Sequence, residues 1–132
     1  MRITADTNIL VRAVMRDDRK QATAAARLLK DAEIIAVPLP CLCEFVWVLR
    51  RVYSLGQNDI HAALQALLNA ENVAVNRPAA DAGLAVLDAG GDFADGVIEF
   101  EGRWLGGETF VSFDRKAVAL LEKQGQTARI LG

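Results

Sequence analysis

The sequence RITADTN at residues 2–8 decides how the rest of the chain is interpreted. Ile3–Ala5 can form a short buried strand, which ends at the acid Asp6 and two small polar residues. Apolar residues then recur at helical spacing, at Ile9, Leu10, Ala13 and Val14. Asp6 is therefore expected at the carboxyl end of a strand, where a helix begins and where open α/β sheets bind ligands. The alternative is that Asp6 only caps that helix, since aspartate readily accepts hydrogen bonds from the first helical N–H groups.

Length and composition favour a single domain covering residues 1–132. Of the 132 residues, 52% are hydrophobic and 24% are charged, which is typical of a globular chain with a substantial core. The net charge of −2 does not favour nucleic acid as a partner, although a bound cation can recruit phosphate. No apolar run is long enough to span a membrane and no apolar leader follows Arg2, so we expect a cytoplasmic protein.

The cysteines and the histidine argue against zinc and against a histidine-based nucleophilic mechanism. Cys41 and Cys43 are separated by one residue, a spacing that bridges poorly, so we expect both to be reduced and partly buried. A zinc site would need two more ligands, and the single histidine, His61, lies on an expected helix far along the chain.

Strand and helix patterns alternate along the chain. After the first strand, apolar runs predict strands at 34–37, 73–75, 109–113 and 128–131. Helical spacing predicts helices over 8–16, 20–31, 41–53, 58–69, 77–89, 93–105 and 115–124, with Asn58 or Asp59 capping the fourth. This order predicts an α/β fold, in which helices flank a central, mostly parallel sheet of about four to five strands.

Glu44 falls inside the apolar stripe expected for the helix at 41–53. The stripe comprises Leu42, Phe45, Val46, Leu49 and Val52, and is widened by Trp47 and Val48. An unpaired buried carboxylate is costly. Glu44 therefore either faces solvent or requires a partner or a metal ion.

Three further acids occupy comparable places. Asp114 directly follows the strand at 109–113, so parallel strands would place Asp6 and Asp114 at one edge of the sheet. Asp95 lies in the first turn of its helix and Glu44 in the first turns of another, and such helices begin at that same edge. Asp92 is either a further acid beside the site or the N-cap of the helix at 93–105, and the cap is the favoured interpretation. The helix dipole alone is a competing explanation for acids in a first turn.

A converging set of carboxylates predicts a metal site. Close carboxylates repel one another unless they are compensated, and no basic residue in these segments obviously pairs with them. Carboxylate oxygens and water are the ligands that Mg²⁺ and Mn²⁺ prefer. One such ion, or two about 4 Å apart, can support an in-line displacement at phosphorus without a histidine base.

In these segments the sequence resembles the PIN-domain nucleases, and among them the VapC-type toxins of bacterial toxin–antitoxin pairs. The resemblance covers nearly the whole chain and rests on ADTN at 5–8, Glu44, DFAD at 92–95 and VSFD at 111–114. It implies a PIN-like three-layer sandwich. It also implies that the active site, which binds Mg²⁺ or Mn²⁺, is formed by Asp6, Glu44, Asp95 and Asp114.

The resemblance further implies an activity and partners. The activity is endonucleolytic hydrolysis of RNA, often a structured RNA such as tRNA, and the partners are a second copy of the chain and a VapB-like antitoxin that covers the site. Thr7, Asn8 and Ser112 match small polar positions beside the acids and are expected to orient carboxylates or water, unless they serve only in caps and turns. Gly96 departs from the family, in which a larger residue usually follows the aspartate, and is expected to loosen the helix start.

Two other function classes compete with a nuclease. A catalytically silent module would keep the fold and bind a protein or RNA, but folding alone does not require a repulsive cluster of acids. A phosphoacceptor signalling domain also gathers acids at strand ends, but it normally has a lysine at the end of its last strand, where this chain has ARILG at 128–132. Basic residues that could touch RNA, or simply be solvated, are Arg12, Arg16, Arg19 and Lys20.

Overall fold

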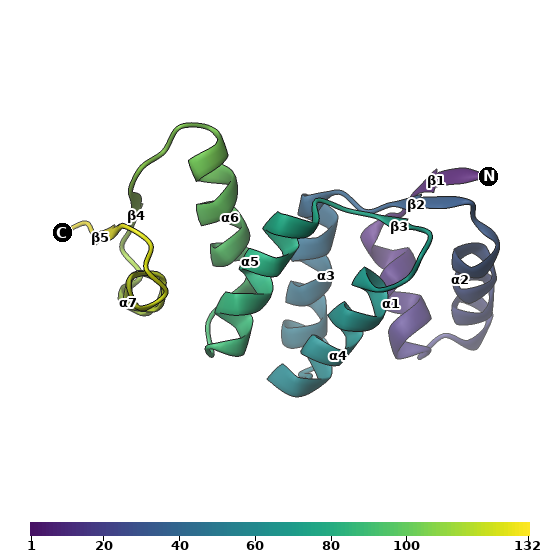
Figure 1. The fold of residues 1–132 in the computed structure, drawn as a ribbon. Helices are drawn as coiled ribbons and strands as arrows, with labels where there is room; N and C mark the ends of the chain where they lie inside the picture. The colour runs from purple at the N-terminus through teal and green to yellow at the C-terminus, as the bar shows by residue number, and fades with distance from the viewer. The chain divides into compact units, whose positions relative to one another are not determined.

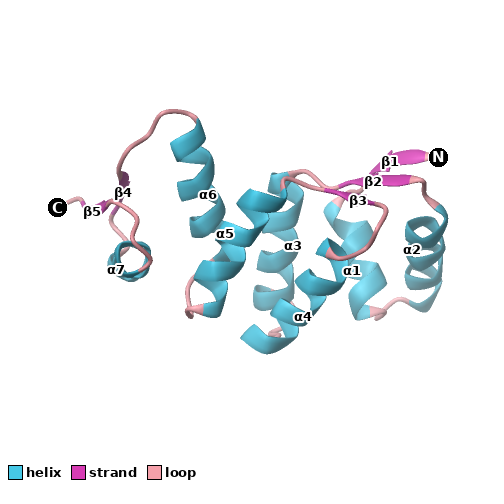
Figure 2. Cartoon of the chain, in the orientation of Figure 1, coloured by secondary structure: helices cyan, strands magenta, loops and turns pink.

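The computed structural model describes all of residues 1–132 as seven helices and five strands (Figure 1). Figure 2 shows that the strands are short and that helices make up most of the chain. By internal packing the chain divides into two compact units, Met1–Asn76 and Arg77–Gly132. Every strand pairing is parallel, which confirms the predicted α/β class with a parallel sheet. None of the helices has the length and apolar character that a membrane span requires.

The first unit contains a three-stranded sheet and four helices. In chain order its elements are β1 (Arg2–Thr4), α1 (Thr7–Met15), α2 (Arg19–Asp31), β2 (Ile34–Ala36), α3 (Leu39–Arg51), α4 (Gln57–Leu68) and β3 (Val73–Ala74). The strands lie side by side in the order β1-β2-β3 (Figure 1). Ile35 in the central strand pairs with Ile3 and Val73 and is 2% exposed, as expected for the middle of a parallel sheet.

The helices of this unit are amphipathic and bury their apolar faces. α1 packs against α2 and α3. The buried side chains on these three helices include Leu10, Val11, Ala22, Ala25, Leu42, Phe45, Val46 and Leu49. Because β1 and β2 are parallel, the residues that follow both strands lie at one edge of this sheet, and α1 and α3 begin there.

The second unit contains a two-stranded sheet and three helices. Its elements are α5 (Arg77–Asp88), α6 (Phe93–Trp104), β4 (Phe110–Ser112), α7 (Arg115–Lys123) and β5 (Ala128–Ile130). α7 packs against β4 and β5 and buries Val118 and Leu121. The Gln124 side-chain amide donates a hydrogen bond to the Ala85 carbonyl at 3.0 Å, which ties the end of α7 to α5.

Two glycines allow α5 and α6 to approach closely. A Cβ added at Gly83 would overlap the Phe93 ring, and one added at Gly96 would overlap the Ala82 backbone. The chain turns between the two helices at Gly90, whose φ of 93° favours glycine. Gly96 is thus buried in a close helix contact, a packing role that the sequence did not predict.

The predicted elements all exist and their ends agree with the structure to within two residues. The predicted cap of α4 is wrong: the N-cap is Gly56, which makes no side-chain hydrogen bond, rather than Asn58 or Asp59. The predicted stripe on α3 is too wide, because Trp47 and Val52 are 57% and 62% exposed.

Candidate functional site

Asp6 both caps α1 and presents a carboxylate to solvent. The Ala5 N–H donates to the Ala36 carbonyl at 3.0 Å and extends the β1–β2 ladder by one residue, after which Asp6 turns the chain into the helix. Asp6 Oδ1 accepts the Thr7 N–H at 2.9 Å, so the capping role is confirmed. Asp6 is exposed, and its second oxygen, Oδ2, makes no hydrogen bond within the protein. Capping thus uses only one of the two carboxylate oxygens of Asp6.

The first turns of α3 place Glu44 near Asp6. Pro40 stands at the start of α3, where the missing N–H costs nothing because the first helical N–H groups have no partner in the helix. Glu44 follows Cys41 by three residues and lies on the same helix face. Asp6, Cys41 and Glu44 line one open hollow of about 390 Å³. Glu44 is exposed and forms no ion pair, so it is not buried in the apolar stripe of α3.

Thr7 and Cys41 connect the β1–α1 turn to α3. The Thr7 hydroxyl donates to Cys41 Sγ at 3.6 Å, and the Cys41 thiol donates to the Ala5 carbonyl at 3.3 Å. Thr7 is 4% exposed, so its hydroxyl needs a partner inside the protein. Burial raises the pKa of the Cys41 thiol, the Thr7 hydrogen bond lowers it, and the charges of Asp6 and Glu44 raise it again. Neither cysteine is in a disulfide and both are partly buried, as predicted.

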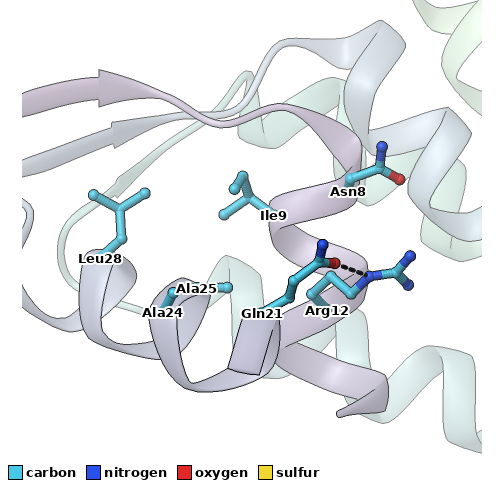
Figure 3. A pocket seen from close by; sticks show the side chains of 7 residues that line it. All are labelled: Asn8, Ile9, Arg12, Gln21, Ala24, Ala25 and Leu28. Atoms are coloured by element: carbon cyan, nitrogen blue, oxygen red, sulfur yellow. Dashed lines mark hydrogen bonds between the residues drawn. The ribbon is translucent and has the colours of Figure 1, made fainter. Parts of the chain in front are cut away.

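Asn8 lines a different depression. Its side chain borders a hollow of about 460 Å³ between α1 and α2 (Figure 3). Arg12 borders this hollow and donates through Nε to the Gln21 side-chain oxygen Oε1 at 2.7 Å (Figure 3). Arg12 also donates to the Tyr53 hydroxyl at 3.1 Å and pairs with Asp17 at 3.5 Å. The side chain of Arg12, a candidate contact to RNA, therefore already has partners within the fold.

The second unit gathers Asp92, Asp95 and Asp114. The pKa of Asp95 is raised from 3.8 to about 6, first by burial and then by the nearby charges of Asp92 and Asp114. Asp95 is half-buried in the first turn of α6, and its carboxylate has no hydrogen-bond or ion-pair partner. Ionisation of Asp95 thus places a third negative charge near two others, an arrangement that a bound cation would stabilise.

Asp92 and Asp114 are both helix N-caps. Asp92 Oδ1 accepts the Ala94 N–H at 3.2 Å, which confirms the predicted cap. Asp114 Oδ1 accepts two N–H groups from the first turn of α7, at 3.0 and 3.1 Å. Ser112 lies beside this cap, because its hydroxyl oxygen accepts the Asp114 N–H at 3.0 Å. Ser112 thereby fixes the turn that presents Asp114 at the end of β4.

The donor set fits a hard divalent cation. The four acids occur as two groups, Asp6 with Glu44 in the first unit and Asp95 with Asp114 in the second, and none of them forms an ion pair. Carboxylate oxygens are the ligands that Mg²⁺ and Mn²⁺ prefer. No three His, Cys, Asp or Glu side chains are placed to hold an ion as they stand. The chain therefore carries the right ligand types, two of them in each unit.

Glu99 is a buried acid that sequence reasoning missed. Its side chain is 6% exposed and accepts the Arg103 Nε–H at 2.8 Å. Arg103 in turn stacks over the Phe100 ring at 5.3 Å. The spacing of Glu99 and Arg103, four residues apart on one helix, was the available signal. Because Glu99 is already paired with a cation, it is a poor candidate for a metal ligand.

Comparison with known proteins gives one family. The model of the PIN domain family matches residues 3–122, a span that contains all four acids. A search of curated proteins found no match.

Proposed function

Because the chain belongs to the PIN domain family, whose members are generally metal-dependent nucleases, we propose that it is a Mg²⁺- or Mn²⁺-dependent endoribonuclease. The observation that carries this proposal is Asp95, a half-buried carboxyl that has no cationic partner and lies near Asp92 and Asp114. Folding alone gains nothing from placing these acids near one another without a cationic partner. A cation-binding site, in contrast, uses such unpaired carboxylates as ligands.

In this proposal residues 1–132 act as a single PIN-like domain, and the ion is held by Asp6, Glu44, Asp95 and Asp114. A divalent ion bound there would help to generate hydroxide from water and would stabilise charge on the phosphoryl and leaving oxygens. Asp6 and Asp114 each use one oxygen as a helix cap, which restricts the carboxylate and leaves the other oxygen for a ligand.

Small polar groups would hold these carboxylates in place. The Thr7 N–H donates to Asp6, and the Ser112 hydroxyl fixes the turn at Asp114. Asn8 is proposed as a further orienting group, although it borders the hollow between α1 and α2 and not the one that Asp6 lines. Ligand-orienting partners of this kind commonly tune metal affinity.

We further propose that the protein is a VapC-type toxin. This finer assignment rests on the resemblance of ADTN at 5–8, DFAD at 92–95 and VSFD at 111–114 to that group. It predicts RNA as the substrate, with tRNA the first to test, a homodimer, and a VapB-like antitoxin that covers the site. Such a toxin would act in the cytoplasm, where its RNA substrates are.

The test is cleavage of total bacterial tRNA and mRNA by the purified protein with Mn²⁺ or Mg²⁺. We expect discrete fragments that disappear with EDTA and in Asp95→Asn, with a loss of at least about 100-fold, comparable to removal of an essential catalytic group. Asp59→Asn is the matched control, since Asp59 is also an acid in a helix first turn, on α4. Full metal-dependent cleavage by folded Asp95→Asn would refute the proposal.

A silent binding module is the second candidate. It is favoured by one observation: Asp6, Asp92 and Asp114 all cap helices, a role that explains these three acids without a metal ion. A melting temperature that is the same with EDTA and with Mn²⁺, together with no cleavage of any RNA, would favour this candidate.

A further inference from the structure

Cys41 contacts the residues on both sides of Asp6. Its thiol donates to the carbonyl of Ala5, the residue before Asp6, at 3.3 Å. Its sulfur accepts the hydroxyl of Thr7, the residue after Asp6, at 3.6 Å. Ala5 and Thr7 are 2% and 4% exposed, so water competes little for these two contacts. One side chain therefore holds the chain immediately before and immediately after the carboxylate.

The same side chain is linked to Glu44 by the helix. Cys41 and Glu44 are three residues apart on α3, a spacing that places them on one face. Both border the hollow that Asp6 also lines. The contacts of the thiol with Ala5 and Thr7 are therefore hydrogen bonds between the turn that bears Asp6 and the helix that bears Glu44.

We propose that Cys41 is a positioning residue, whose thiol sets the Asp6 carboxylate relative to the Glu44 carboxylate. The consequence for metal binding rests on the proposed function, in which these two acids are ligands. The positioning itself does not, because it can be measured on the metal-free protein.

The competing explanation is that Cys41 only fills space, as half-buried cysteines often do. Serine separates the two roles, since a hydroxyl can donate to Ala5 and accept from Thr7 but is smaller than a thiol. Alanine removes both hydrogen bonds. A space-filling role predicts similar effects for Cys41→Ser and Cys41→Ala, whereas a positioning role predicts that serine retains the wild-type behaviour.

The decisive measurement is amide hydrogen exchange in EDTA. The Thr7 amide donates to Asp6 Oδ1, and the Gln21 amide donates to Asp18 Oδ1 at 3.0 Å in the equivalent cap of α2. We expect Cys41→Ala to accelerate exchange at Thr7 roughly fivefold, the effect of losing a typical hydrogen bond, and to leave Gln21 unchanged. Cys41→Ser should stay close to wild type. Unchanged exchange at Thr7, or equal acceleration at Thr7 and Gln21, would overturn the inference.

Metal titration and kinetics extend the test. We expect Cys41→Ala to weaken Mn²⁺ binding roughly tenfold, as loss of a ligand-orienting partner does, and to lower kcat for RNA cleavage while KM is retained. Cys43→Ala, two residues along the same helix, is the matched control. Wild-type protein that binds no Mn²⁺, with Thr7 exchange still accelerated in Cys41→Ala, would support positioning and refute the nuclease proposal. Wild-type binding that Cys41→Ala leaves intact, with unchanged exchange, would refute positioning alone.

Discussion

Gly96 lies directly against the backbone of Ala82, and a Cβ at position 96 would overlap the Ala82 carbonyl oxygen. The obstructing atom belongs to the backbone, so it cannot swing aside as the end of a flexible side chain could. Gly96 is also the residue after Asp95 in the first turn of α6. The contact that brings α6 against α5 therefore also fixes the backbone on which Asp95 is presented.

Gly96→Ala should destabilise the protein. Overpacking against backbone typically costs about 1–3 kcal/mol, which urea unfolding would measure. Gly102→Ala on the same helix is the control, because a Cβ there meets nothing within 4 Å. Replacing a helical glycine with alanine at such an open position should stabilise the protein by about 0.5–1 kcal/mol. Equal stability of both variants would contradict the packing argument.

The metal-free protein should lose stability as pH rises through the titration of Asp95. Its folded pKa is about 6, against 3.8 without the fold, so between these values the folded state binds more protons than the unfolded state. The stability that protonated Asp95 contributes is fully present below the unfolded pKa of 3.8 and is lost as pH rises through the folded pKa of about 6. Asp95→Asn should therefore become steadily more stable than wild type over that interval. Urea unfolding in EDTA would measure the free energy of unfolding of both proteins. A difference between them that stays constant from pH 3.8 to about 6 would contradict the raised pKa of Asp95.

Mn²⁺ should stabilise the wild-type protein and not Asp95→Asn. A ligand that binds only the folded state at 100 times its Kd adds about 2.7 kcal/mol to the free energy of unfolding. We expect the melting temperature to rise with Mn²⁺ concentration and to return to its starting value with EDTA. Asp59→Asn should respond as wild type does. An equal rise in the melting temperature of Asp95→Asn would show that Asp95 is not a ligand of the ion.

Replacing Arg103 should lower the free energy of unfolding, because Glu99 would stay buried without a cationic partner. Glu99 is 6% exposed and Arg103 is 43% exposed, so in Arg103→Met a buried carboxylate loses its cationic partner. We expect a loss of about 1–3 kcal/mol in the free energy of unfolding. The double variant Glu99→Leu/Arg103→Met should recover most of it, because apolar replacement of both partners removes the unpaired charge.

The matched control for that pair is Asp81→Asn. Asp81 pairs with Arg77 at 3.0 Å on the surface, at the same spacing of four residues. An exposed pair of this kind contributes about 0.2–1 kcal/mol, so the variant should be nearly neutral. A cost for Arg103→Met no larger than for Asp81→Asn would show that the burial of Glu99 has no energetic consequence.

Features that depend on short stretches of sequence were predicted well. Asp6 and Asp114 follow strands and begin helices as expected, and Asp92 is the expected cap, because strand ends and N-caps involve residues only a few positions apart. The cap of α4 was nevertheless predicted wrongly, and the predicted width of the apolar stripe on α3 failed because it depends on partners far along the chain. Trp47 and Val52 face solvent, since which side of α3 is covered is set by the elements that pack on it.

The sequence by itself determined the order of strands and helices, the parallel α/β class and the four acids at element ends, because spacing and capping act locally. Only the tertiary structure decided which groups meet. It brought Cys41 to the residues on either side of Asp6, which are 34 and 36 positions away. It also required glycine at position 96, where α6 crosses the backbone of α5. Such contacts follow from packing between elements distant in sequence, and no periodicity within either element specifies them.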